Sequence, residues 1–546
     1  MRTPIPWLGV ALALMCLSAY GRQGAPDLIL VNGKVFTSDA GHPYAEALAI
    51  RGERIVAVGN SAAIGALAGK LTRHIDLAGR VVIPGLNDAH NHLAVEPKDL
   101  VEVATTTFNP DWTELRAALA AKAASTPRGT LLEAKIADKV FKDLSVNRDS
   151  LDAVSADHSV ALITFTGHAW ILNSAGLERA GIHADTPDPQ GGRFERDSGG
   201  RLTGVVREYA ALNAERNLAD ATSDADAQSS LRETLERATA WGITTIQDMS
   251  NEMAPERAVR LLEAVPTPIR VRVMRMPGTT PAGRNVGEGR GMPVHPSALI
   301  TVSGTKWMLD GVPLEFTFDA RGSHKGWRDL PSADELYRDL PPTFPEAEMQ
   351  AMLRETLRDH DSLLLHVTGY QAARAMLQQM EASGGPPVWA SRRVRFEHGD
   401  GLFPDLIPRA KALGIVVVQN PTHFAVLGDD VQKVAQPVRS LLAAGIPVAL
   451  GSDGPMNPYL NIMLAVIHPH QHSEGITREQ AVIAYTRTAA YAEFAETDKG
   501  TLEAGKLADL AVLSQDIFTV PLPELPKTKA LLTLVGGRIV HDAGAL

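Results

Sequence analysis

Cysteine is almost absent from this sequence of 546 residues. The single cysteine, Cys16, lies in an N-terminal segment where Arg2 precedes the apolar stretch WLGVALALMCLSAYG. The stretch is short for a bilayer span, and Ala19 and Gly21 have the small-x-small spacing of a cleavage site. We therefore expect residues 1–21 to be a signal peptide. An uncleaved anchor and a lipid-modified cysteine are the alternatives, disfavoured by the length of the stretch and by the bulky residues before Cys16, respectively.

Removal of this leader would leave a mature chain with no cysteine. Disulfides, a thiolate nucleophile and Cys-ligated zinc are then excluded. Any metal would have to be held by His, Asp, Glu or Lys chemistry. We expect the mature protein to be exported, to the periplasm or out of the cell, without stable insertion in a membrane.

Basic runs are also missing. The 53 Lys and Arg residues are outnumbered by 63 Asp and Glu residues, which gives a formal charge of -10. This mild acidity argues against nucleic-acid binding through a general electrostatic surface, and a small-molecule partner is expected instead. No Gly-rich dinucleotide loop opens the first helical stretch, which argues against a doubly wound sheet that binds dinucleotides.

Both ends of the chain carry short β-hairpin patterns. LILVNGKVFT and LAIRGERIVAVG lie before residue 60, and LTLVGGRIVH lies after residue 530. Asn-Gly and Gly-Gly between alternating apolar residues are typical of tight hairpin turns. We expect 27–84 and 500–546 to form one small β-sandwich domain; the alternative is a chance resemblance among short hairpins.

The body of the chain, 85–499, alternates short apolar runs with helical stretches. Near-continuous apolar strands that alternate with helices predict a parallel sheet covered on both faces. A count of eight favours an α/β fold of the (β/α)8 TIM-barrel type over an open doubly wound sheet. Residues 93–240 exceed what one helix needs, so we expect an insertion there, over the barrel mouth. The eight runs are 86–92, 243–249, 269–276, 300–308, 362–367, 393–398, 414–419 and 448–453.

Residues able to bind or bridge metals occur near the ends of five of these runs. Functional residues of such barrels lie at the C-terminal ends of the strands. Each of these residues alone is compatible with a structural role, and a lone His-x-His is common. Their joint occurrence at one rim favours a metal-binding centre. The residues are His90, His92, Lys306, His366, His398 and Asp453.

The same segments carry a family resemblance. The motifs are PGLNDAHNH, GITTIQD, TKWMLDG, LLLHVTG, RFEHGD, VVVQNPTHF, GSDGP and GTLEAGKLADLAVL, and they extend over nearly the whole chain after the leader. Together they resemble the amidohydrolase superfamily, and within it the YtcJ-like branch that includes N-substituted formamide deformylases. GHAWILNSAGLERAGI, in the expected insertion, is similar to that branch as well.

The resemblance implies a centre with two divalent ions, for which zinc is expected first. His90 and His92 would bind one ion together with Asp453, and His366 and His398 would bind the other. Manganese, iron or cobalt would also suit such nitrogen and oxygen ligands. Neither the metal identity nor the oligomeric state follows from the sequence.

Lys306 is the unusual member of this set, because an ammonium repels cations. The resemblance implies that Lys306 is N-carboxylated, since a neutral amine can add carbon dioxide to form an anionic carbamate that bridges two metals. Burial near two dications favours loss of the ammonium proton, which makes this modification reasonable. The alternative is a salt bridge from Lys306 to Asp310 or Asp453.

The implied chemistry is hydrolysis of an amide-type C–N bond. A metal-bridging water would lose a proton and attack the carbonyl as hydroxide, with Asp453 taking that proton and passing it to the leaving nitrogen. The expected enzyme is an amidohydrolase acting on non-peptide C–N bonds of amides, formamides or N-acyl compounds. A lactonase, an esterase or an N-acyl amino acid deacylase on the same centre is the alternative. A non-catalytic scaffold is disfavoured because no expected ligand is missing.

Substrate contacts are expected from the insertion and from the loop QNPTHF. His168 and Trp170 could line the pocket above the metals, and His423 lies on the catalytic rim with Phe424 beside it. Packing is the competing role for each aromatic residue. Trp307 should point away from its neighbour Lys306, into the helix layer, because side chains alternate along a strand.

Overall fold

The computed structural model describes residues 24–107, 109–312, 337–425 and 436–546, so the expected signal peptide lies outside the described residues. The central unit is an eight-stranded sheet in which all neighbouring strands pair in parallel. Each of the eight predicted runs overlaps one of its strands. In chain order they are β8 (Leu86–Asn91), β15 (Ile243–Ser250), β16 (Arg270–Arg275), β19 (Ile300–Met308), β20 (Leu363–Val367), β21 (Arg395–His398), β22 (Val416–Gln419) and β23 (Val448–Leu450).

The sheet curls into a nearly closed barrel. Just beyond β23, the backbone N–H of Asp453 donates to the carbonyl oxygen of His90 in β8 at 2.9 Å, which joins the first strand to the last. The chains approach closely here: a Cβ added at Gly451 would lie 2.5 Å from Cβ of His90. Only glycine therefore allows this closure, which brings His90 and Asp453 together.

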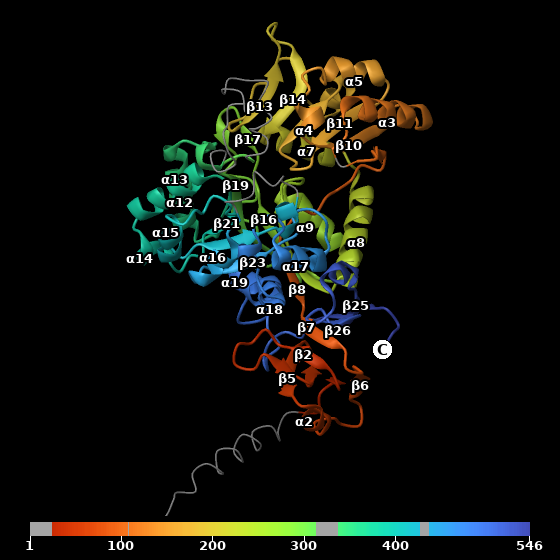
Figure 1. The fold of residues 1–546 in the computed structure, drawn as a ribbon, viewed down its shortest axis with the longest axis vertical. Helices are drawn as coiled ribbons and strands as arrows, with labels where there is room; N and C mark the ends of the chain where they lie inside the picture. The colour runs from red at the N-terminus through yellow and green to blue at the C-terminus, as the bar shows by residue number, and fades with distance from the viewer. Residues whose placement is uncertain (1–23, 108, 313–336, 426–435) are drawn as a thin grey trace, which may run out of the picture.

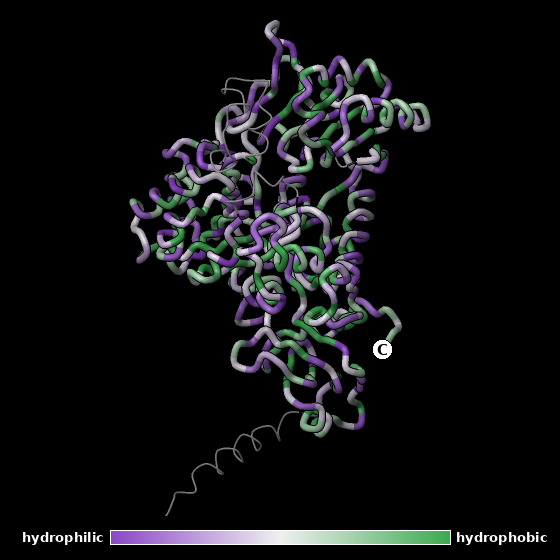
Figure 2. Tube along the Cα trace, viewed as in Figure 1, coloured by the Kyte–Doolittle hydropathy of each residue, from purple (hydrophilic) through white to green (hydrophobic). Residues whose placement is uncertain are grey.

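Helices cover the outside of the barrel and share its core (Figure 1). Ser223 accepts a hydrogen bond from the backbone N–H of Asp226 and caps the start of the first of these helices. Figure 2 shows hydrophobic positions concentrated inside the molecule and hydrophilic positions toward its periphery. The helices are α8 (Asp224–Ala240), α9 (Pro255–Ala264), α12 (Glu346–Asp359), α13 (Tyr370–Ala382), α15 (Ile407–Ala412), α16 (Val438–Ala443) and α17 (Pro458–Ile467).

Two sheets at one end of the molecule combine both ends of the chain. One contains β5 (Arg54–Gly59), β4 (Ala47–Arg51), β1 (Leu28–Val31) and β6 (Arg73–Asp76). The other contains β26 (Arg538–Asp542), β25 (Ala530–Val535), β24 (Leu510–Leu513), β7 (Val81–Pro84), β2 (Lys34–Phe36) and β3 (Tyr44–Ala45). Antiparallel pairing of β24 with β7 joins the two chain ends, and a shared apolar core lies between the sheets. The expected β-sandwich is therefore present, and two of the predicted hairpins form, β4 with β5 and β25 with β26. The hairpin expected for LILVNGKVFT does not form, because Asn32-Gly33 carries the chain from β1 in one sheet to β2 in the other.

The insertion forms a mixed six-stranded sheet of its own at the opposite end of the barrel (Figure 1). Apolar cores lie on both faces of this sheet. Its strands are β9 (Leu100–Glu102), β10 (Leu131–Ile136), β11 (Ser159–Thr164), β12 (Ala169–Leu172), β13 (Gly192–Arg196) and β14 (Leu202–Glu208). Its helices are α3 (Trp112–Ser125), α4 (Asp138–Lys142), α5 (Arg148–Val154), α6 (Ser174–Arg179) and α7 (Tyr209–Asp220). In the part of the chain that the structure describes, no helix is long and apolar enough to cross a membrane.

Candidate metal centre

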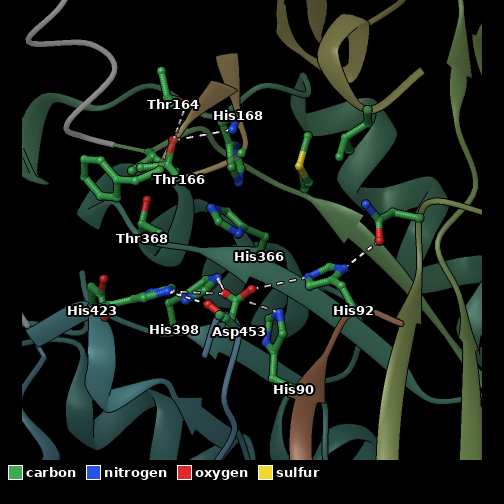
Figure 3. A pocket seen from close by; sticks show the side chains of 18 of the residues that line it. His90, His92, Thr164, Thr166, His168, His366, Thr368, His398, His423 and Asp453 are labelled. Atoms are coloured by element: carbon green, nitrogen blue, oxygen red, sulfur yellow. Dashed lines mark hydrogen bonds and ion pairs between the residues drawn. The ribbon is translucent and has the colours of Figure 1, made fainter. Parts of the chain in front are cut away.

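The predicted ligands meet around one carboxylate at the C-terminal mouth of the barrel (Figure 3). Oδ2 of Asp453 lies 3.5 Å from Nε2 of His90 and 3.6 Å from Nε2 of His398, and Oδ1 lies 3.4 Å from Nε2 of His92. One donor atom each from His90, His398 and Asp453 falls within 4.8 Å of the others. These three residues come from β8, β21 and the segment after β23, so barrel closure is what assembles them.

The opposite nitrogens of these imidazoles are held by fixed partners. Nδ1 of His90 lies 2.8 Å from a carboxylate oxygen of Glu397, and Nδ1 of His92 lies 2.6 Å from Oδ1 of Asn251. With the Asn420 amide oriented so that its oxygen faces the ring, Nδ1 of His398 donates to it at 3.1 Å. Such partners fix the ring orientation and leave each Nε2 lone pair directed at the centre, as in protein metal sites.

His366 carries the clearest sign of a missing partner. Its Nε2 is buried and has no hydrogen-bond partner among the residues described. A carboxylate oxygen of Asp310 lies 3.9 Å away, which is too far for a hydrogen bond. Its ring centroid is 4.5 Å from that of His398. A buried polar atom without a partner is costly. The donor set and this orphaned nitrogen fit a divalent metal centre.

Burial favours the neutral form of three of these imidazoles. It lowers the pKa of His90 to about 4, with Lys306 as a further cause, and it lowers the pKa of His366 and His398 well below 6.5. At His92 burial has the same direction, but the hydrogen bond and charge of Asp453 outweigh it and raise the pKa. Burial alone would raise the pKa of Asp453, but the surrounding histidines hold it well below 3.8. Neutral imidazoles and an ionised carboxylate are the states in which these groups bind metals.

Lys306 lies inside the barrel beside this cluster. Its Nζ is 3.1 Å from Nε2 of His90, and the residue is 2% exposed. Burial lowers the pKa of the amine, although Glu397 and Asp453 oppose this effect. Within the described ranges Lys306 makes no ion pair with Asp310 or Asp453, so the salt bridge considered from the sequence is not formed.

A buried ion pair fixes Glu397 beneath the centre. Nε of Arg395 donates to Oε1 of Glu397 at 2.8 Å, and the other carboxylate oxygen receives His90. Burial would raise the pKa of Glu397, but Arg395 and His90 hold it at about 2. Glu397 and His398 are neighbours, yet both reach the barrel interior, because the φ of 69° at His398 breaks the strand alternation. Sequence reasoning missed Glu397 for this reason.

The ligands form the floor of a cavity of about 250 Å³. Its roof comes from the β11–β12 turn at residues 163–168 and from α7, so the insertion does lie over the barrel mouth. Nδ1 of His168 is 2.8 Å from Glu208, and its ring centroid is 4.8 Å from that of His366. Nε2 of His423 lies 2.9 Å from the carbonyl oxygen of Asp453. Both histidines line the cavity.

The two tryptophans named from the sequence lie elsewhere. Trp170 is 3% exposed, packs in the core of the insertion and donates from Nε1 to the Gly167 carbonyl at 3.1 Å. The structure does not place it on the cavity wall, and no contact with a substrate follows from its position. Trp307 lies under the Arg284 guanidinium, 4.7 Å from the ring centre, and faces away from the cavity as strand alternation predicts.

Other residues of the cavity carried no recognisable sequence signal. Thr164 ends β11 and Thr166 lies in the turn that leads to β12, and no motif marked this turn in the sequence. Asn251 follows the second barrel strand, where the C-terminal-end rule could have found it. The cavity also contains Glu215, Lys135, Asp400 and Gln436.

Comparisons with known proteins agree with this geometry. The model of the amidohydrolase family matches residues 73–541. The chain is 27% identical to an N-substituted formamide deformylase of Arthrobacter pascens, over 94% of this chain and 98% of that protein. It is 25% identical to the putative amidohydrolase YtcJ of Bacillus subtilis, over 86% of this chain and 91% of that protein. Among solved structures, an uncharacterized metal-dependent hydrolase from Pyrococcus horikoshii has a similar fold, with a TM-score of 0.67, 20% identity, and coverage of 91% of this chain and 99% of that one.

Proposed function

The chain belongs to the amidohydrolase family and is a metal-dependent hydrolase acting on C–N bonds, and we propose that it cleaves the amide-type bond of a small N-acyl or N-formyl compound. One observation carries the proposal: three Nε2 atoms, from the ends of two barrel strands, converge on the Asp453 carboxylate at the floor of a cavity. Convergent imidazoles and a carboxylate form a donor set that suits a catalytic divalent metal with room for substrate.

We assign the centre two divalent ions, with zinc as the first candidate. His90, His92 and Asp453 would hold one, and His366 and His398 the other, with N-carboxylated Lys306 between them. Such ions supply Lewis acidity to the scissile carbonyl and acidify a water molecule. The buried, neutral-favouring environment of the Lys306 amine and the orphaned Nε2 of His366 support this assignment.

Asp453 would transfer the proton in this reaction. Its carboxylate lies at the centre of the ligand cluster and borders the cavity. It would accept a proton from the attacking water at Oδ1 or Oδ2 and deliver it to the departing nitrogen, which then leaves as an amine. The carbonyl oxygen of Asp453 is contacted by His423, which helps to hold the residue in its strained conformation, with a φ of 38°.

The cavity limits the size of the substrate. Its volume of about 250 Å³ is near the lower end of small-molecule sites. His168, held by Glu208, and His423 both line the cavity and would contact the substrate. The formamide deformylase named above acts, by its name, on N-substituted formamides. A formamide or another short acyl amide is the substrate class that these dimensions favour.

The decisive experiment is a substrate panel on chelated and on metal-reconstituted protein. Formamides, other amides, N-acyl amino acids, esters and lactones are compared at equal metal content. We expect release of an amine from formamides or short amides, and its loss on chelation. Exposed Lys70 provides a control, since Lys70→Ala should match the wild type. Hydrolysis of esters and lactones alone, or C–N cleavage that survives complete metal removal, would contradict the proposal.

We further propose that the protein is exported with removal of residues 1–21. The support is the sequence alone: Arg2, the apolar stretch that follows it, and small residues at Ala19 and Gly21. The test is mass spectrometry of the protein from fractionated cells. A chain that begins at residue 22 in the periplasm or medium is expected, and an intact chain confined to the cytoplasm would contradict export.

A further inference from the structure

Two buried side chains that line the same cavity, and are not among the proposed metal ligands, carry acceptor oxygens without partners. Asp400 is 7% exposed and Gln436 is 2% exposed, and both line the cavity. Oδ1 of Asp400 and Oε1 of Gln436 have no hydrogen-bond partner in the part of the chain that is described. Burying polar oxygens without donors is unfavourable, so such atoms call for a specific explanation.

A neighbouring carboxylate shows that burial alone does not produce this state. Asp310 is fully buried, and its oxygens receive the backbone N–H groups of Thr368 at 3.0 Å and Gly369 at 2.7 Å. Asp310 is thus satisfied by the protein itself. Asp400 has the same chemistry and interacts electrostatically with Asp310, but one of its oxygens has no hydrogen-bond partner among the described residues.

The surroundings of Asp400 are held in place by neighbouring segments. The side-chain amides of Gln436 and Gln419 lie close enough to the Asp400 carboxylate to act on it as donors. The Gln419 amide also donates to the His398 carbonyl, and Nε2 of His468 lies 3.1 Å from the backbone carbonyl oxygen of Gln436. The Gln419 side chain and the Gln436 backbone are therefore fixed.

We propose that Asp400 and Gln436 determine substrate specificity by accepting hydrogen bonds from an N–H donor on a part of the substrate that does not react. The inference rests on the proposed function and narrows it: the substrate is an amide that carries a second nitrogen group. An ammonium satisfies both oxygens and compensates the carboxylate charge, so it binds more strongly than a neutral carboxamide. A substrate with an alkyl group at this position leaves both acceptors buried and unpaired.

A conservative substitution distinguishes specificity from structural support. In Asp400→Asn we expect the side-chain oxygen to turn toward the Gln436 and Gln419 amides, because an NH2 group cannot accept a hydrogen bond from them. The new NH2 group then takes the place of the unpartnered oxygen, so an acceptor becomes a donor. If Asp400 had only a structural role, the substitution would lower kcat/KM for all substrates alike. The specificity role predicts that the preference between donor and non-donor substrates is reversed.

The kinetic test uses three formamides matched in length: N-formyl-1,3-diaminopropane, N-formyl-β-alaninamide and N-formylbutylamine. For the wild type, kcat/KM should fall in that order, with the ammonium exceeding the butyl compound about 10- to 100-fold. Asp400→Ala should bring this ratio close to one, and Asp400→Asn should place the ammonium last. Exposed Asp405, on the same segment, is the matched control, and Asp405→Ala should keep the wild-type ratio.

A binding measurement separates this inference from the proposed function. Calorimetry on the metal-loaded protein compares 1,3-diaminopropane with butylamine and needs no turnover. Preference for the diamine that is lost in Asp400→Ala supports the acceptor pair even if no formamide is hydrolysed. Equal binding of the two amines and equal kcat/KM across the three formamides would overturn the inference. That result is expected if a bound water molecule already satisfies both oxygens. Because Asp400 lies two residues from His398, the metal content of every variant is measured, and ratios from variants with wild-type content decide the result.

Discussion

The floor and the roof of the cavity are built in different ways. The floor consists of side chains at the ends of barrel strands, and its imidazoles have fixed partners on their outer nitrogens. The roof consists of a turn between two strands of an inserted sheet, with Thr164, Thr166 and His168, together with part of α7. Reaction chemistry thus resides on the barrel, whereas the inserted roof can select substrates without disturbing the ligands.

Two of the contacts between floor and roof involve histidines of the proposed centre. His168 lies beside His366, with tilted rings whose centroids are 4.8 Å apart. Asn251 bonds His92 through its oxygen and donates to Glu215 of α7 at 2.7 Å. These contacts are where a change in the roof would reach the metal centre. The following substitutions test how separate the two regions are.

The largest effect is expected in the floor, at Lys306. Lys306→Ala removes the proposed bridging ligand, and activity should fall by about three orders of magnitude or more, given several kcal/mol of lost stabilisation. The metal content should fall with it. Elemental analysis and kcat/KM on the same sample check this, with Lys70→Ala as the exposed control. Full activity with both metals retained would end the bridging assignment.

A smaller effect is expected one contact further from the metals, at Glu397. Glu397→Gln weakens the hydrogen bond that orients His90 and leaves Arg395 without its ion-pair partner. Loss of such a partner typically lowers metal affinity or activity about 10- to 100-fold. Metal titration of the apo-protein measures the affinity. An unchanged metal affinity together with unchanged kcat would mean that Glu397 does not position His90.

A substitution in the roof should raise KM and leave the metal content unchanged. His168→Ala removes a side chain from the cavity, and KM should rise about tenfold, the worth of one modest polar contact. Metal content should stay at the wild-type level, because His168 is not among the proposed ligands. Exposed His183 in the same insertion offers a matched control, His183→Ala. If metal were lost in His168→Ala, the division between floor and roof would fail.

Trp170 should have the smallest catalytic effect of the four. Trp170→Ala opens a cavity in the core of the insertion and should lower its stability by about 3–5 kcal/mol. At a temperature where the insertion remains folded, kcat and KM should nevertheless stay close to wild type, since Trp170 does not border the site. Chemical denaturation measures the change in stability, and steady-state kinetics measure kcat and KM. A selective change in KM without loss of stability would restore Trp170 as a substrate contact.

The barrel and most of the cluster could be predicted because one rule places them. Parallel barrel strands present their C-terminal ends at a single mouth, so His90, Lys306, His366 and His398 must lie at the same rim once the strands are recognised. Each strand was recognisable as a buried apolar run. The hairpins β4–β5 and β25–β26 could be predicted from their turn glycines, whereas Asn32-Gly33 connects two sheets and closes no hairpin. Pairing of β7 with β24 then joins two segments more than 400 residues apart.

The remaining features depend on local backbone geometry that the sequence does not display. The run SVALITFTGHAWILN folds as β11 and β12 around a turn with Gly167 at a φ of 77°, so His168 enters the cavity while Trp170 enters the core. The positive φ of His398 brings Glu397 and His398 to the same side, against strand alternation. Gln436 is likewise placed by a left-handed conformation, with a φ of 65°.

The metal stoichiometry of the pure, folded enzyme tests the account most directly. The protein is stripped with a chelator, saturated with zinc, freed of excess metal and assayed for zinc per chain, with circular dichroism to verify folding. The account predicts two tightly held ions per chain, each lost when its own histidines are replaced by alanine. A fully folded protein that retains no divalent ion would contradict it.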